Sequence, residues 1–218
     1  MKRVMVSAST NPPKEDDLID YVKKIDGLID FMHCDVMDGK FVKSKCLSSE
    51  KVKEINEISS VKLDCHLMVK NPTKKIKRFA KAGANLITVH YEAFKSKIKL
   101  RHCLNKIKEY NCLCGLAINP DTKVEQIKRF LPIVDVVLVM SVVPGKSGQE
   151  FMFSVLHKIK TLSQIRFAKK YNYLIEVDGG INNKISATLI NNGADIVVSG
   201  SFLYKSNDYK QTIFSLKY

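Results

Sequence analysis

The sequence predicts a (β/α)8 barrel, and three observations support this fold class. Short apolar runs typical of strands alternate with amphipathic helical stretches along all 218 residues, and the alternation gives eight βα units. Helix-ending glycines such as Gly83 and Gly193 stand just before the next run. Strict alternation favours a parallel sheet with helices outside, and eight units close into a barrel. No linker or composition shift interrupts the series, so we expect residues 1–218 to form one domain.

The elements follow one another in this order. The expected strands are residues 4–9, 31–37, 62–68, 86–91, 112–118, 136–140, 174–178 and 196–200. The expected helices are residues 15–24, 48–57, 72–82, 94–110, 124–130, 149–170, 184–192 and 204–216. In a barrel of this kind the chemistry lies at the carboxyl ends of the strands. Nearly all notable polar groups of this sequence fall at such ends.

Composition excludes several classes of protein. The chain is 45% hydrophobic, enough for a large core, and it has no apolar run of membrane-spanning length and no signal peptide. We therefore expect a cytoplasmic protein that does not bind a membrane. Six cysteines without a CxxC pair indicate reduced thiols.

The net charge of +14 suggests nucleic-acid binding, but only five of the 36 basic residues are Arg. Readers of bases and phosphates rely on Arg. The lysines occupy the solvated faces of helices, so we expect no nucleic-acid partner. The charge can still attract anionic sugar phosphates.

Two strands each present a histidine beside a carboxylate. Side chains at i and i+2 share one face of a strand, so His33 points with Asp35, and His66 points with Asp64. A third strand ends at Asp178. For any one of these residues, a hydrogen-bonded core histidine or a capping aspartate would be the simpler interpretation. Together, however, the two histidines and Asp35 and Asp178 predict a divalent-metal site whose aspartates could also move protons, which indicates an enzyme. This donor set suits zinc, iron(II), manganese or cobalt.

Glycines follow the last three strands. Gly179 and Gly180 come after the seventh strand, and Gly200 and Ser201 after the eighth, where such barrels bind phosphate. Ordinary turns are the alternative. The loop 141–149, with Gly145 and Gly148, has the length of a mobile lid.

Other groups at the strand ends leave two interpretations open. The methionines there are core filler or an apolar cap that excludes water from a reactive intermediate; they are Met37, Met68 and Met140. His90 and Glu92 also face one way. We favour a local hydrogen bond without a catalytic role over a pair that supports a metal ligand.

Seven stretches together resemble the ribulose-phosphate 3-epimerase family. They are HCDVMDGKFV, DCHLMVKNP, KAGANLITVHYEA, GLAINPDT, VLVMSVVPGKSGQEF, IEVDGGIN and GADIVVSGS, in order along the chain. The resemblance implies a TIM barrel of the ribulose-phosphate-binding type, usually a homo-oligomer, that holds one divalent metal ion. It implies that His33, Asp35, His66 and Asp178 are the metal ligands, with Asp35 and Asp178 as the acid/base pair.

The resemblance also implies that Ser7 contacts the sugar and that the phosphate is held by Gly148, Gly179, Gly180, Gly200 and Ser201. We add His66, Gly145 and the three methionines as substrate contacts. The lid reads PGKSGQ where the family commonly has PGFGGQ, and Ser9 stands where Asp is common. Lys146 then offers a compensating charge to the phosphate.

We therefore expect a metal-dependent epimerase of carbohydrate metabolism. It would interconvert D-ribulose 5-phosphate and D-xylulose 5-phosphate at C3 through an enediolate, in the pentose phosphate pathway. The nearest alternative is a 3-epimerase of a hexulose phosphate such as allulose 6-phosphate. A non-catalytic barrel that binds a sugar phosphate is the alternative from another class.

Overall fold

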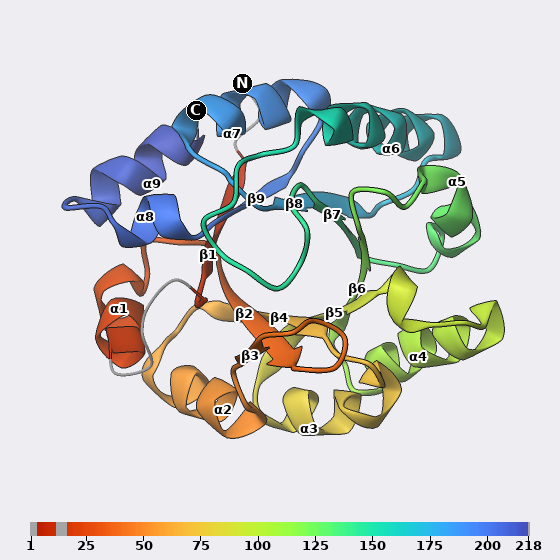
Figure 1. Ribbon diagram of the computed structural model, residues 1–218, viewed down its shortest axis with the longest axis horizontal. Helices are drawn as coiled ribbons and strands as arrows, with labels where there is room; N and C mark the ends of the chain where they lie inside the picture. Colours follow the sequence, from red (N-terminus) through yellow and green to blue (C-terminus); the bar gives the residue numbers. More distant parts are fainter. Residues whose placement is uncertain (1–3, 12–16, 218) are drawn as a thin grey trace.

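Eight parallel strands close into a barrel in the computed structural model, which describes residues 4–11 and 17–217 (Figure 1). The barrel strands are β1 (Met5–Ser9), β2 (Phe31–Asp38), β4 (Lys62–Met68), β5 (Ala84–His90), β6 (Leu113–Ile118), β7 (Val136–Met140), β8 (Leu174–Asp178) and β9 (Ile196–Ser199). The barrel closes because β1 pairs in parallel with both β9 and β2. A two-residue strand, β3 (Lys45–Cys46), pairs antiparallel with the end of β2.

Helices surround the barrel in sequence order, as Figure 1 shows. They are α1 (Leu18–Ile25), α2 (Ser49–Ile58), α3 (Ile76–Lys81), α4 (Lys97–Glu109), α5 (Val124–Ile127), α6 (Leu156–Lys169), α7 (Asn183–Asn192), α8 (Ser201–Tyr204) and α9 (Tyr209–Lys217). Short 3₁₀ turns precede α3, α4 and α6 and follow α5. None of the helices in the described part of the chain combines the length and apolar character that a bilayer crossing needs.

The expected fold class is confirmed, and the strand ends differ from expectation by two residues or fewer. The helix expected at 149–170 begins only at Leu156, because residues 149–152 belong to the loop that crosses the barrel mouth. The helix expected at 204–216 is two helices, because Asp208 starts a new one: its side chain accepts from the backbone N–H of Gln211 at 2.9 Å. The start of the helix expected at 15–24 lies partly outside the described residues.

Alternation along the strands gives the barrel two different sides. The outward side packs under the helices as a continuous apolar core, which includes Cys34 and Cys65. All six cysteines are free thiols, as predicted. The inward side is polar at its centre, where His33, His66 and Glu176 are completely buried. The fold therefore places several ionisable side chains in the barrel interior.

A buried lysine joins α6 to the loop after β6. Lys158 is only 3% exposed. Its Nζ donates to the carbonyl oxygens of Asn119 (2.9 Å) and Thr122 (2.7 Å), and also to that of Pro120. The loop that carries these carbonyls also holds Glu92 through hydrogen bonds.

We expect Lys158→Met to lower the free energy of unfolding by about 2 to 4 kcal/mol, because three carbonyl groups lose a charged donor. Urea unfolding monitored by circular dichroism measures the change. Lys160→Met is the matched control, since Lys160 is exposed on the same helix. Equal stability of the two variants would contradict a structural role for Lys158.

Candidate metal and acid/base centre

Four predicted ligands converge at the mouth of the barrel. His33 and Asp35 come from β2, His66 from β4, and Asp178 from the end of β8. One ligand atom of each lies within 4.8 Å of those of the other three. The structure therefore brings together the whole set that the sequence predicted.

The separations of the donor atoms fit a single cation. His33 Nε2 lies 3.2 Å from His66 Nδ1 and 3.6 Å from Asp35 Oδ1. His66 Nδ1 lies 3.3 Å from Asp35 Oδ1, and His33 Nε2 lies 3.9 Å from Asp178 Oδ2. Ligands bound tetrahedrally at about 2.0–2.1 Å stand about 3.3 Å apart. Two imidazole nitrogens and two carboxylate oxygens at these spacings can hold a divalent metal ion.

Behind His33 lie two carboxylates that belong to the barrel interior. Asp64 Oδ2 is 2.5 Å from His33 Nδ1, and Glu176 Oε1 is 3.7 Å from the same nitrogen. Burial, together with the charge of Asp64, raises the pKa of Glu176 to about 8. Sequence reasoning missed Glu176, although its i−2 spacing from Asp178 in a strand was the available signal. A carboxylate behind a ligating histidine fixes the orientation of the ring.

The second histidine predicted as a ligand, His66, also has a hydrogen-bonding partner on the side of its ring away from the donor set. His66 Nε2 lies 2.7 Å from His90 Nε2, and His90 Nδ1 lies 3.2 Å from Glu92 Oε2. The local His90–Glu92 pair that we favoured from the sequence is present. That interpretation is incomplete, because His90 also contacts His66.

Asp35 is held by a serine that the sequence analysis noted only as a departure from the family pattern. Ser9 Oγ donates to Asp35 Oδ2 at 2.8 Å, and Ser9 lines the cavity in front of the site. Ser7 lies deeper in the same strand, fully buried, and its hydroxyl has no hydrogen-bond partner among the described residues. Ser7 is not among the residues that line the cavity. Its contact with the sugar stays a prediction.

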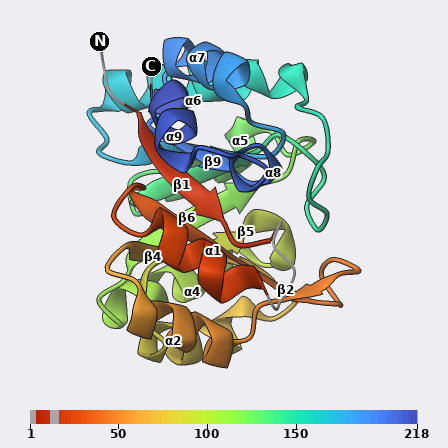
Figure 2. The same ribbon diagram turned by 90° about the vertical axis from the view of Figure 1, so that its left-hand side faces the viewer.

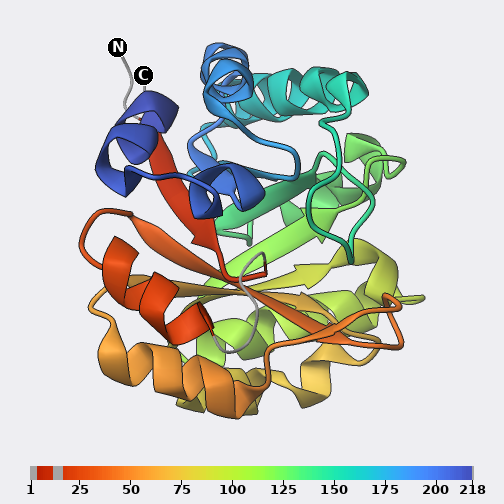
Figure 3. The same ribbon diagram turned by 60° about the vertical axis from the view of Figure 1, so that its left-hand side comes forward.

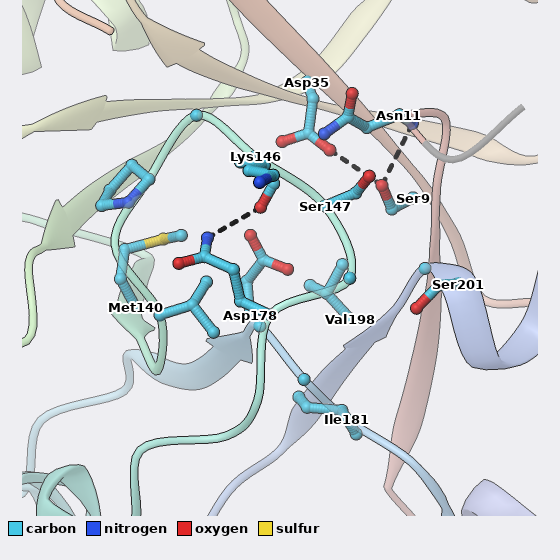
Figure 4. A pocket seen from close by; sticks show the side chains of 18 of the residues that line it. Ser9, Asn11, Asp35, Met140, Lys146, Ser147, Asp178, Ile181, Val198 and Ser201 are labelled. Carbon is cyan, nitrogen blue, oxygen red and sulfur yellow. Dashed lines mark hydrogen bonds between the residues drawn. The ribbon is translucent and has the colours of Figure 1, made fainter. Parts of the chain in front are cut away.

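The pKa values of the two aspartates are shifted in opposite directions. Burial acts to raise the pKa of Asp35, but the charge of His33 and hydrogen bonds with His33 and His66 outweigh it and hold this pKa below its usual range. Burial raises the pKa of Asp178 to about 7; the charge of His33 opposes this rise and that of Asp35 adds to it. A pair of carboxyl groups separated in this way can supply one base and one acid near neutral pH. Figure 4 shows both side chains pointing into the cavity.

A cavity of about 60 Å³ lies in front of the aspartates. The predicted contacts that line it are Met37, Met68, Met140, Gly145, Gly148, Gly179, Gly180, Gly200 and Ser201. The three methionines therefore form an apolar wall beside the acidic groups. His66 is predicted as a contact too, but it lies behind this lining, fully buried.

The loop 141–152 covers the cavity. It extends from the same end of the barrel as the β2–β3 hairpin (Figures 2 and 3). Ser44 of that hairpin donates to the carbonyl oxygen of Gly145 at 2.6 Å, and Gln149 Nε2 donates to those of Val143 (2.7 Å) and Lys146 (2.8 Å). Gly180 faces the loop with φ +65°, and a Cβ there would lie 2.5 Å from the backbone nitrogen of Phe151. Only glycine fits this close approach.

Solved structures with a similar fold have low sequence identity to this chain. The 3-keto-L-gulonate-6-phosphate decarboxylase of Vibrio cholerae superposes with a TM-score of 0.74 at 14% identity, over 99% of this chain and 96% of that one. A 3-hexulose-6-phosphate synthase gives a TM-score of 0.70 at 13% identity, over 98% of both chains. At these identities the likeness shows the barrel fold alone.

Sequence relatives are closer. The ribulose-phosphate 3-epimerase of Bacillus subtilis is 38% identical over 192 residues, which is 88% of this chain and 87% of the relative. That of Synechocystis is 34% identical over 217 residues, or 99% of this chain and 94% of the relative. The model of the ribulose-phosphate 3 epimerase family matches residues 5–204. This chain therefore belongs to the ribulose-phosphate 3-epimerase family of isomerases.

Proposed function

We propose that this enzyme interconverts D-ribulose 5-phosphate and D-xylulose 5-phosphate by inverting C3, with Asp35 and Asp178 as the acid/base pair. The observation that carries the proposal is the pair of aspartates on one cavity, with pKa values displaced in opposite directions. Epimerase activity itself follows from the family.

Inversion next to a carbonyl group needs two proton-transferring groups. One aspartate removes the C3 proton from one face of the sugar, and the other returns a proton to the opposite face of the enediolate. Near neutral pH, Asp35 is ionised while Asp178 can hold a proton. In the reverse reaction the two aspartates exchange roles. A single carboxylate could not serve both faces without a large movement.

A divalent cation held by His33, Asp35, His66 and Asp178 would supply positive charge beside the oxygen atoms on which negative charge develops. Zinc, iron(II), manganese and cobalt all suit this donor set. The methionine wall keeps water away from the reacting carbon and so limits side reactions. Ser9, by donating to Asp35 Oδ2, holds this carboxylate in place while it works.

The far end of the cavity supports the substrate's phosphate. The glycine loops after β8 and β9 meet the lid loop there; their cavity-lining residues are Gly148, Gly179, Gly180, Gly200 and Ser201. Backbone N–H groups in such loops bind anions. Lys146 also lines the cavity and adds a positive charge. We further propose Ser7 and Gly145 as substrate contacts.

We propose that residues 1–218 make up a single catalytic barrel domain, that it works in the cytoplasm in the pentose phosphate pathway, and that it forms a homo-oligomer. Its partner is a small-molecule sugar phosphate, with no role for nucleic acid or membrane. Family membership supports the choice of substrate.

We expect Asp35→Asn and Asp178→Asn each to lower the rate of epimerisation by about 10² to 10⁴-fold, because one face of the sugar loses its proton-transferring group. Proton NMR in D₂O follows both epimerisation and exchange at C3. Each variant should still exchange the C3 proton slowly with solvent, but in only one of the two sugars. Asp35→Asn should retain this exchange in one sugar, and Asp178→Asn in the other. Asp20→Asn, an exposed change on α1, is the control. An active double variant would refute the two-base mechanism.

The protonated state of Asp178 predicts a pH dependence of stability. In chelated, metal-free protein the folded state binds this proton up to a pKa of about 7, against an ordinary value of 3.8. Binding of this proton stabilises the folded state fully at pH values below 3.8. This stabilisation is lost as the pH rises through about 7. The side chain in Asp178→Asn has no such proton to lose. The free energy of unfolding of this variant, relative to that of wild type, should therefore rise as the pH increases from 3.8 to about 7. Urea unfolding across that pH range tests this, and parallel curves would contradict it.

Lys146 should matter for binding the phosphate group. We expect Lys146→Ala to raise KM about threefold to tenfold with little change in kcat, because an exposed charge acts mainly on substrate association. Lys43→Ala is the control, since Lys43 is exposed in the nearby hairpin turn and does not line the cavity. An unchanged KM in Lys146→Ala would remove Lys146 from the site.

A further inference from the structure

We propose that Ser44 of the β2–β3 hairpin is a positioning residue that holds the loop 141–152 over the cavity. Its hydroxyl binds the tip of this loop, which we define as residues 143–148. The tip residues that line the cavity are Pro144, Gly145, Lys146, Ser147 and Gly148. The contact is a property of the protein alone, and only its consequence for substrate binding rests on the proposed function.

The two ends of the loop are fixed by the barrel. The backbone N–H of Ser141 donates to the carbonyl oxygen of Asp178 at 2.8 Å, and Ser141 Oγ donates to that of Gly179 at 2.7 Å. The backbone N–H of Met152 donates to the carbonyl oxygen of Ser141 at 2.9 Å, which closes the base of the loop. These bonds fix where the loop starts and ends, but they do not determine the path of the tip between them.

The tip has a single polar connection to the rest of the described chain. Ser44 Oγ donates to the carbonyl oxygen of Gly145 at 2.6 Å. The side-chain amide of Gln149 also donates to two carbonyl oxygens of the tip, but these bonds lie within the loop. In the described part of the chain, no other hydrogen bond or ion pair joins residues 143–148 to an element outside the loop. The position of the tip therefore depends on Ser44.

Glycine at position 145 allows the hairpin to come this close. Gly145 has a φ of +106°, a conformation that favours glycine, and a Cβ there would lie 2.8 Å from the Cβ of Val42. Val42 stands two residues before Ser44 in the same hairpin. The hairpin thus contacts the tip both by packing and by a hydrogen bond.

The hairpin turn is itself held firmly, so it can support the loop. Asp38 Oδ1 accepts from the backbone N–H of Phe41 at 2.9 Å, and its Oδ2 accepts from that of Lys70, after β4, at 3.0 Å. The backbone N–H of Gly39 donates to the carbonyl oxygen of Ser44 at 3.0 Å, which closes the turn. Ser44 therefore has a defined place before the loop meets it.

Loss of the Ser44 hydroxyl should release the tip without disturbing the acid/base pair. One hydrogen bond of this kind shifts a conformational equilibrium by about 3 to 10-fold. When the tip leaves the cavity, Lys146 and Gly148 leave its phosphate end, and substrate binds more weakly. Asp35 and Asp178 stay on their strands, so we expect turnover of bound substrate to change little.

Three variants separate this role from a general effect on folding. Ser44→Ala removes the hydroxyl, and Ser44→Thr keeps it and should behave as wild type. Ser154→Ala is the matched control, because Ser154 is exposed and its side chain forms no hydrogen bond within the described residues.

The first measurement is limited digestion with trypsin, with the cleavage products quantified by mass spectrometry. Lys146 is the only Lys or Arg of the loop 141–152, and cleavage after it requires the tip to leave its place. The cleavage rate follows the population of the open form when opening and closing are fast. We expect Ser44→Ala to be cleaved after Lys146 about 3 to 10-fold faster than wild type, and the other two variants at the wild-type rate.

Two results of the digestion would overturn the proposal. One is an unchanged rate of cleavage after Lys146 in Ser44→Ala. The other is faster cleavage after lysines throughout the chain, which would show that the variant is destabilised as a whole.

The second measurement is steady-state kinetics with D-ribulose 5-phosphate. We expect Ser44→Ala to raise KM about 3 to 10-fold with kcat changed by less than about twofold, and Ser44→Thr to restore KM. A lower kcat at unchanged KM would overturn the link between Ser44 and substrate binding. If wild type does not epimerise this sugar, the proposed function fails, and the cleavage rates alone then decide whether Ser44 holds the loop.

Discussion

The imidazole of His33 lies among four carboxylates, and the charge balance of the barrel interior depends on it. Its Nδ1 is 2.5 Å from Asp64 and 3.7 Å from Glu176, and its Nε2 is 3.6 Å from Asp35 and 3.9 Å from Asp178. Burial opposes a charge on this ring, but the charges of Asp64 and Asp35 raise its pKa well above the usual value. Without His33, these four neighbouring carboxyl groups would repel one another when ionised, at a high cost in free energy.

This arrangement gives different pKa values to the two aspartates that face the cavity. Asp35 lies near both His33 and His66 and stays ionised, whereas Asp178 lies at the edge of the cluster, where burial dominates. The difference arises from distance to the imidazoles, since both residues are aspartate. A bound cation would replace part of the charge that His33 now supplies. The same geometry thus suits both the proposed metal site and the proposed acid/base pair.

The parallel barrel makes this concentration of charge possible at a tolerable cost. All eight strands end at one mouth, so residues as far apart in the sequence as Ser9, Asp35, Asp178 and Ser201 line one small cavity. The outward faces of the same strands carry the apolar residues that pack under the helices. Because side chains alternate between the two faces, the stabilising core and the polar site do not compete for positions.

The sequence by itself determined the barrel, the strand positions and the four convergent candidate ligands. These features follow from local periodicity: alternation places His33 beside Asp35 within one strand, and parallel strands bring their carboxyl ends together. Tertiary structure alone decided how far the loop over the cavity extends, since its residues 149–152 have a helix-compatible pattern but belong to this loop. It also decided which groups support the ligands. Glu176 behind His33, His90 behind His66 and Ser9 on Asp35 are contacts between different strands. Such contacts depend on strand register and ring orientation, which no pattern within a single strand contains.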